Sequence, residues 1–283
     1  MITLSYEEFL MACPSATNPS EQLFRDIEGI IEESAEKLIE VVGPAIAERL
    51  DKIQEGQLAP ETTPEWLALK YAKKYVALDA YATAIPQLDL VLTNTGFGVV
   101  SNQNVAPASS DRVARLLERV LRSKDDIFDR FLSNLRRIAG WGDSPEAMRH
   151  ISSIFWRSNL MKFFGLAAPT RSDLHRYAVD IAAGEAALKK LMGREQWQAL
   201  LEYERNGKYD IMIDELITDC RRFVAVMASG RDPELYRRSI LALLDSSEEI
   251  FAPYHQSSAC KANHFEPYRN RKDDTTFFFG SCR

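Results

Sequence analysis

The stretch AKKYVAL at residues 72–78 returns in altered form as CRRFVAV at residues 220–226, an offset of 148. Downstream, KDDIF at residues 124–128 matches SEEIF at residues 247–251, an offset of 123. Upstream matches keep the same order along the chain: Leu23 with Leu174, Gly43 with Gly193, and Leu50 with Leu200. Each short match could arise by chance, but several in one order indicate an internal duplication.

The change in offset predicts a segment that only the first copy contains. The offsets 148 and 123 differ by 25 residues, about the length of the segment 86–108. In this segment β-prone runs flank the turn-forming Asn94-Thr95-Gly96, a pattern typical of a β-hairpin. We therefore predict three regions: a first helical repeat over residues 1–143 with the β-hairpin inserted at about 86–108, a second helical repeat over 144–252, and an extended aromatic C-terminal tail over 253–283.

Hydrophobic residues recur at helical spacing over most of the chain, which indicates amphipathic helices. The pattern predicts helices near residues 20–42, 44–53, 65–85, 109–138, 145–164, 172–191, 194–204, 209–228 and 233–251. Ser5 and Glu8 form a capping-box pattern that predicts a short helix ending before Pro14, and Gly43-Pro44 predicts a helix break. The predicted fold class is mostly α, with duplicated three-helix units, an inserted β-hairpin and an extended C-terminal tail.

The composition is that of an ordinary folded protein, with 46% hydrophobic and 27% charged residues. A chain that mainly coats phosphates is usually basic, whereas this chain has a net charge of −6. The net charge does not exclude a local basic patch. The sequence has no signal-peptide pattern and no apolar run near the roughly 18 residues that span a bilayer. We expect a cytoplasmic protein, or a virion component if the chain is of phage origin. The cysteines should be free thiols, because they are far apart: Cys13, Cys220, Cys260 and Cys282.

Several patterns could carry chemistry, and each has a simpler explanation. The run Gly96-Phe97-Gly98 lacks the third glycine of a dinucleotide fingerprint and predicts a β-turn. Ser258-x-x-Lys261 has no companion motif of the acyl enzymes. A zinc-compatible set has no known finger spacing: His255, Cys260, His264 and Cys282. We predict no enzymatic activity, no cofactor, no metal and no small-molecule substrate.

Two charged rows are predicted on helix faces. An acidic row, which could hold a metal between helices but finds no His or Glu-x-x-His partner, is predicted to be a solvated face: Glu32, Glu36 and Glu40. A basic stripe follows the hairpin: Arg112, Arg115, Arg119 and Arg122. The stripe could contact phosphates of a nucleic acid, meet the acidic row of a neighbouring subunit, or be solvated.

Two segments carry a resemblance to a known family. The sequences LTNTGFGVVSNQNVAPAS at residues 92–109, PYRNRKDD at 267–274 and FFFG at 277–280 resemble an uncharacterised protein family from prophages and mobile elements of gut bacteria. With the helical matches, the resemblance covers nearly the whole chain. That family is similar in plan to the helical head–tail connector proteins of tailed phages, which form rings beneath the capsid portal. The resemblance implies a helical assembly protein and brings no catalytic residues.

The leading hypothesis is a non-enzymatic structural or adaptor protein that assembles with itself or with other virion or prophage proteins. A hairpin and a tail can add strands to a neighbour or fill its grooves. The tail has three consecutive phenylalanines, each of which would gain roughly 1.5–3 kcal/mol on burial, so we expect them to be docked. The predicted contact residues are Phe97, Val99 and Val100 of the hairpin and Phe277, Phe278 and Phe279 of the tail. The alternative is a nucleic-acid-associated helical protein that uses the stripe Arg112–Arg122 close to DNA.

Overall fold

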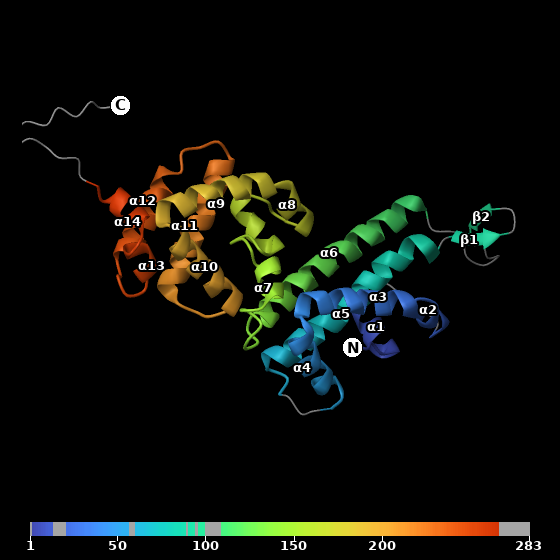
Figure 1. Ribbon diagram of the computed structural model, residues 1–283. Coiled ribbons are helices and arrows are strands. Elements are labelled where there is room, and N and C mark those ends of the chain that lie inside the picture. The colour runs from blue at the N-terminus through green and yellow to red at the C-terminus, as the bar shows by residue number, and fades with distance from the viewer. Residues whose placement is uncertain are drawn as a thin grey trace, which may run out of the picture.

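The computed structural model describes residues 2–13, 21–56, 60–88, 90–93, 96–99 and 109–265, and the protein is mostly helical (Figure 1). The helices of the first half are α1 (Tyr6–Ala12), α2 (Glu21–Asp26), α3 (Glu28–Val42), α4 (Pro44–Gln54), α5 (Pro64–Leu88), α6 (Ser110–Leu135) and α7 (Pro145–His150). The second half contains the 3-10 helix η1 (Ser158–Phe164) and the α-helices α8 (Arg171–Arg176), α9 (Ala178–Met192), α10 (Arg194–Asn206), α11 (Ile211–Ala228), α12 (Glu234–Asp245), α13 (Ala252–His255) and α14 (Ser258–Asn263). Two short strands, β1 (Leu90–Thr93) and β2 (Gly96–Val99), pair antiparallel with Leu90 opposite Val99.

The same order of packing appears in both halves. In the first half α5 contacts α1, α3 and α6, α4 packs on α3, and α7 packs on α3. In the second half α11 contacts η1, α9 and α12, α10 packs on α9, and α14 packs on α9. Buried side chains of both halves belong to one continuous core. None of the described helices is both long enough and apolar enough to cross a membrane.

Two glycines that match in the sequence lie at equivalent turns. Gly43 separates α3 from α4 with φ 79° and ψ 156°, and Gly193 separates α9 from α10 with φ 87° and ψ 157°. The positive φ favours glycine, because a Cβ would be strained there. The angle between α3 and α4 should therefore resemble the angle between α9 and α10.

The ends of α3 and α9 are held in corresponding ways. The indole Nε1 of Trp141 donates to the carbonyl of Val41 at 3.2 Å, and Nδ2 of Asn263 donates to the carbonyl of Leu191 at 2.8 Å. Both carbonyls lie two residues before the junction glycine. An unsatisfied buried carbonyl is costly, so each half provides a polar side chain from its last segment.

The predicted match of residues 124–128 with 247–251 does not join equivalent positions of the two halves. The N-cap of α7 is Ser144 and that of α14 is Ser257, an offset of 113 rather than 123. Phe128 lies inside α6, whereas Phe251 directly precedes α13. The offset therefore changes by 35 residues between the halves. Longer helices explain 21 of these residues, because α5 and α6 have 25 and 26 residues, whereas α11 and α12 have 18 and 12. The longer connection between α5 and α6, which contains β1 and β2, explains most of the rest. The extra helix ends project as an arm that carries β1 and β2 at its tip (Figure 1).

Several predicted boundaries also differ from the structure. The helices predicted over 20–42 and 172–191 are interrupted at Ile27 and Tyr177, and the helix predicted over 233–251 ends at Asp245. The helix predicted over 145–164 is interrupted, because α7 ends at His150 and η1 starts at Ser158. The helix predicted to end before Pro86 continues to Leu88. Residues 253–265, expected in an extended tail, form α13 and α14, which pack on α10 and α9. The first half thus ends after α7, and the second includes α14.

Candidate interaction surfaces

The basic stripe lies on the arm, where its four arginines are exposed along α6. Two of the four have acidic partners on the same helix. Arg115 pairs with Asp111, and Arg122 pairs with Glu118 at 3.4 Å. Arg112 and Arg119 form no ion pair with a described residue. The stripe therefore has an excess of about two positive charges, which is modest for a surface that follows a phosphate backbone.

An apolar groove borders the stripe. It lies between α1, α5 and α6, has a volume of about 360 Å³, and is lined by residues that include Met11, Leu78, Leu116, Arg119 and Val120. Met11 is 77% exposed. A neighbouring hollow of about 340 Å³ shares Met11 with this groove and extends it along α5. An apolar floor with a charged rim is the anatomy of a protein–protein interface.

The second half contains an equivalent groove of about 400 Å³ between η1, α11 and α12. Arg222 and Val226 line it, at positions 148 residues after Lys74 and Leu78 of the first groove. Its floor is more aromatic and includes Phe163, Phe164, Tyr177 and Tyr236. The two halves thus present the same kind of surface twice.

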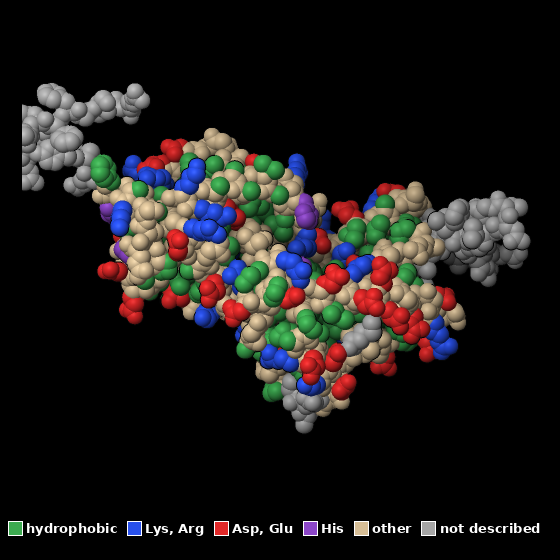
Figure 2. All heavy atoms as spheres, in the orientation of Figure 1, with side chains coloured by type: hydrophobic (Ala, Val, Ile, Leu, Met, Phe, Trp, Pro, Cys, Tyr) green, Lys and Arg blue, Asp and Glu red, His purple; other side chains and the backbone are tan. Residues whose placement is uncertain are grey.

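The acidic row is exposed on α3. Figure 2 shows acidic side chains gathered over α2 and α3. The exposed members at four-residue spacing are Glu28, Glu32, Glu36 and Glu40, and none of them forms an ion pair within the described part of the chain. At 1.5 Å per residue the row spans about 18 Å and the basic stripe about 15 Å. The two charged faces are therefore similar in length and opposite in sign.

A buried charge cluster joins the two halves. Oε2 of Glu204 on α10 accepts hydrogen bonds from Nη1 of Arg136 and Nε1 of Trp156, both at 2.8 Å. Its Oε1 accepts one from Nη2 of Arg221 on α11. Burial raises the pKa of Glu204, but the charges of Arg221 and Arg136 and the hydrogen bonds from Trp156 and Arg221 outweigh burial and hold that pKa below its ordinary value. Because Arg136 directly follows α6, the cluster fixes the arm helix to the second half.

A second buried carboxylate fixes the segment that links the halves. Oδ2 of Asp129 on α6 accepts from the backbone N–H of Ser158 at 2.7 Å and from its hydroxyl, and Oδ1 accepts from Nη1 of Arg171 at 2.9 Å. Asp129 is 7% exposed. Both oxygens of this carboxylate therefore have partners, and these interactions hold η1 and α8 against α6.

Several residues singled out from the sequence fall outside these surfaces. The main chain of Phe97 and Val99 lies in β2, so Gly96-Phe97-Gly98 does not open a helix. Val100 and the phenylalanines 277–279 lie outside the described residues. Nε2 of His255 is 2.9 Å from the carbonyl oxygen of Leu244, and Nε2 of His264 is 3.2 Å from Asp245. Within the described ranges no three His, Cys, Asp or Glu side chains are grouped to hold a metal ion; Cys282 is not among them.

Residues 38–151 match a family model described as a family of unknown function (DUF6712). The matched region is less than half of the chain and ends one residue after α7, where the first half ends. No curated protein and no solved structure matches the chain.

Proposed function

We propose that this chain is a non-enzymatic structural adaptor, a head–tail connector-like component of a phage or prophage that assembles with itself or with other virion proteins. The observation that carries the assembly proposal is the apolar groove around Met11, with Arg119 on its rim. A groove of this kind suits a protein side chain better than a phosphate backbone. The connector assignment rests on the sequence resemblance and on the helical architecture.

We also propose that the two halves are duplicated three-helix units and that the first acquired the β-hairpin as part of its longer arm. The repeated packing order and the equivalent turns at Gly43 and Gly193 support this origin. Duplication explains why the apolar groove occurs twice. A chain with two related grooves can contact two neighbours, which suits a component of a larger assembly.

In the assembly, the basic stripe of one copy lies against the acidic row of the next. The contact joins two different faces, so it is head-to-tail and generates a ring or a filament. Arg112 and Arg119, which pair with no acidic residue in the described ranges, supply the charge on one side, and the row Glu28–Glu40 supplies it on the other. Hairpin and tail residues add further contacts: Phe97, Val99, Val100, Phe277, Phe278 and Phe279.

Light scattering after size-exclusion chromatography tests this contact. The wild-type mass should rise with protein concentration and fall at high salt, because exposed charges are screened. The double variant Arg112→Glu/Arg119→Glu should remain monomeric. Its matched control, Lys190→Glu/Arg194→Glu, makes the same charge change at exposed positions of the second half and should assemble like the wild type. Wild-type protein that stays monomeric at every concentration, alone and with its partner proteins, would contradict the proposal.

The second candidate is a nucleic-acid-associated protein that uses the stripe Arg112–Arg122. It is favoured by Arg112 and Arg119, for which the described part of the chain offers no ion pair, and opposed by the net charge of −6. It predicts DNA binding that weakens with salt and falls in the double variant Arg115→Glu/Arg119→Glu. Fluorescence anisotropy with labelled duplex DNA measures both effects.

A further inference from the structure

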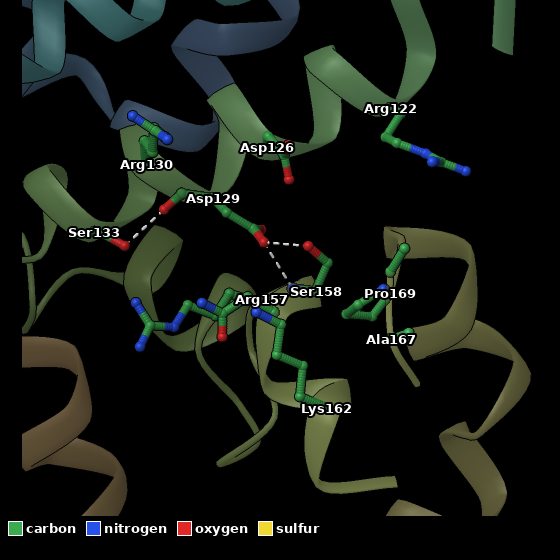
Figure 3. Close-up of a pocket in the computed structure, with 12 residues that line it drawn as sticks. Arg122, Asp126, Asp129, Arg130, Ser133, Arg157, Ser158, Lys162, Ala167 and Pro169 are labelled. Atoms are coloured by element: carbon green, nitrogen blue, oxygen red, sulfur yellow. Dashed lines mark hydrogen bonds between the residues drawn. The ribbon is translucent and has the colours of Figure 1, made fainter. Parts of the chain in front are cut away.

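A polar cleft lies between α6 and the segment 157–169 (Figure 3). Its volume is about 330 Å³. The cationic side chains that line it are Arg122, Arg130, Arg157 and Lys162, and the carboxylates are Asp126 and Asp129. Ala167, Ala168 and Pro169 form a small apolar wall. Residues about 30 positions apart in the chain thus meet at a site that no local pattern in the sequence reveals.

The lining has more positive charge than its carboxylates neutralise. Asp129 already accepts hydrogen bonds from Ser158 and Arg171, so it has little capacity left for the cations of the cleft. Arg130, Arg157 and Lys162 form no ion pair within the described part of the chain. Four cations and two carboxylates give the lining a formal charge of +2, in a chain whose net charge is −6.

Among these cations, Arg157 has a side chain that stacks on an aromatic ring. Its guanidinium lies over the ring of Trp156, 5.1 Å from the centroid. Its Nε is buried and has no hydrogen-bond partner in the structure. Burial, and secondly the nearby Arg221, lower the pKa of Arg157 from its usual high value, although an arginine stays protonated at neutral pH. That Nε has almost no accessible surface, so an anion in the cleft would meet the terminal nitrogens of the guanidinium, which the ring of Trp156 holds in place.

We propose that this cleft binds the phosphate group of a phosphate ester, with Arg130, Arg157 and Lys162 as its ligands. Donors that approach from both walls suit a tetrahedral group with several acceptor oxygens better than a planar carboxylate, which one arginine can bind alone. The cleft is at the lower end of the size range of small-molecule sites, so it accommodates a ligand of about nucleotide size. The cleft shares Arg122 with the basic stripe, but none of its three proposed ligands belongs to the stripe, so the inference can be tested separately from the assembly proposal.

Isothermal titration calorimetry on the full chain tests the site with three probes: inorganic phosphate, adenosine monophosphate and a single-stranded oligonucleotide. All titrations use the same ionic strength, set with chloride. Phosphate should bind, and Arg130→Gln and Lys162→Gln should each weaken its binding at least tenfold. Both side chains are exposed, so their loss should leave folding intact. The matched control Arg194→Gln should bind like the wild type.

The two sources of phosphate give different results. Tighter binding of adenosine monophosphate than of phosphate supports a free nucleotide as the ligand, and tighter binding of the oligonucleotide supports a nucleic-acid strand. The proposal is overturned if none of the probes binds more tightly than chloride, or if both glutamine variants bind like the wild type. Testing Arg112→Glu/Arg119→Glu in parallel separates this proposal from the assembly proposal, because that variant should lose assembly and keep phosphate binding.

Discussion

Replacing Glu204 with glutamine should destabilise the protein strongly, because the cluster around it is buried. The side chains of Glu204, Arg221 and Arg136 are 7%, 11% and 16% exposed. Glu204→Gln keeps the shape of the side chain and removes its charge, which leaves two largely buried guanidinium groups without their counter-ion. Removing one partner of a buried ion pair costs about 3–5 kcal/mol. We therefore expect the free energy of unfolding to fall by about that amount at pH 7, measured by urea denaturation.

The pH dependence provides a second test of the same cluster. The folded-state pKa of Glu204 is lowered, so its contribution to stability is present above the unfolded-state pKa of about 4.3 and is lost as the pH falls further. The difference in stability between the wild type and Glu204→Gln should therefore shrink below about pH 4. The control Glu33→Gln breaks an exposed pair with Lys37 and should have no measurable effect. A loss below about 1 kcal/mol at pH 7, or a difference that persists in acid, would show that the charge of Glu204 does not stabilise the fold.

Two further predictions test the packing of the core. At Gly184 on α9, a Cβ would lie 2.8 Å from a side-chain carbon of α11, so Gly184→Ala should lower the free energy of unfolding by about 1–3 kcal/mol. The control Gly29→Ala adds a Cβ with nothing within 4 Å and should be neutral or slightly stabilising. Thermal unfolding measures both variants. Burial raises the pKa of Cys13 to about 12 and raises the pKa of Cys220 as well. Both thiols should therefore resist alkylation at pH 8 until the protein is unfolded. Peptide mapping that finds either cysteine modified in the native protein would contradict the described core.

Local sequence patterns were sufficient where a single segment decides its own conformation. Ser5 and Glu8 form the capping box that starts α1, and Gly43 ends α3 as its position before Pro44 predicts. Such features depend on residues three or four positions apart, so they can be seen in the sequence. The exposed stripe and the exposed acidic row follow in the same way from helical periodicity.

Features that depend on distant residues could not be predicted. The chain leaves the helical conformation after α7 because side chains of the second half bind the backbone of Ile154. Glu185 accepts a hydrogen bond from the N–H of Ile154 at 3.0 Å, and Nε of Arg221 donates one to the carbonyl of Ile154 at 3.0 Å. In the same way, α13 is held by Gln196, whose side-chain oxygen accepts from the N–H of Tyr254 at 3.2 Å. Partners 30 to 70 residues away leave no local pattern.

Pro86 shows the limit of a rule that is right on average. A proline inside a helix removes one hydrogen bond and crowds the carbonyl four residues earlier. In α5 it lies two residues before the end at Leu88, so the kink that a proline favours has little helix after it to displace. The interruption therefore costs less there than in the middle of the helix.

The most direct test of the account is a charge exchange between the two faces that we propose to meet. Arg112→Glu/Arg119→Glu reverses the stripe, and Glu32→Lys/Glu36→Lys reverses the row, so each variant alone should be monomeric. Mixed in equal amounts, each variant offers the other a complementary face at both contacts. Light scattering should therefore find the wild-type assembly mass restored in the mixture. A mixture that stays monomeric while the wild type assembles would contradict it.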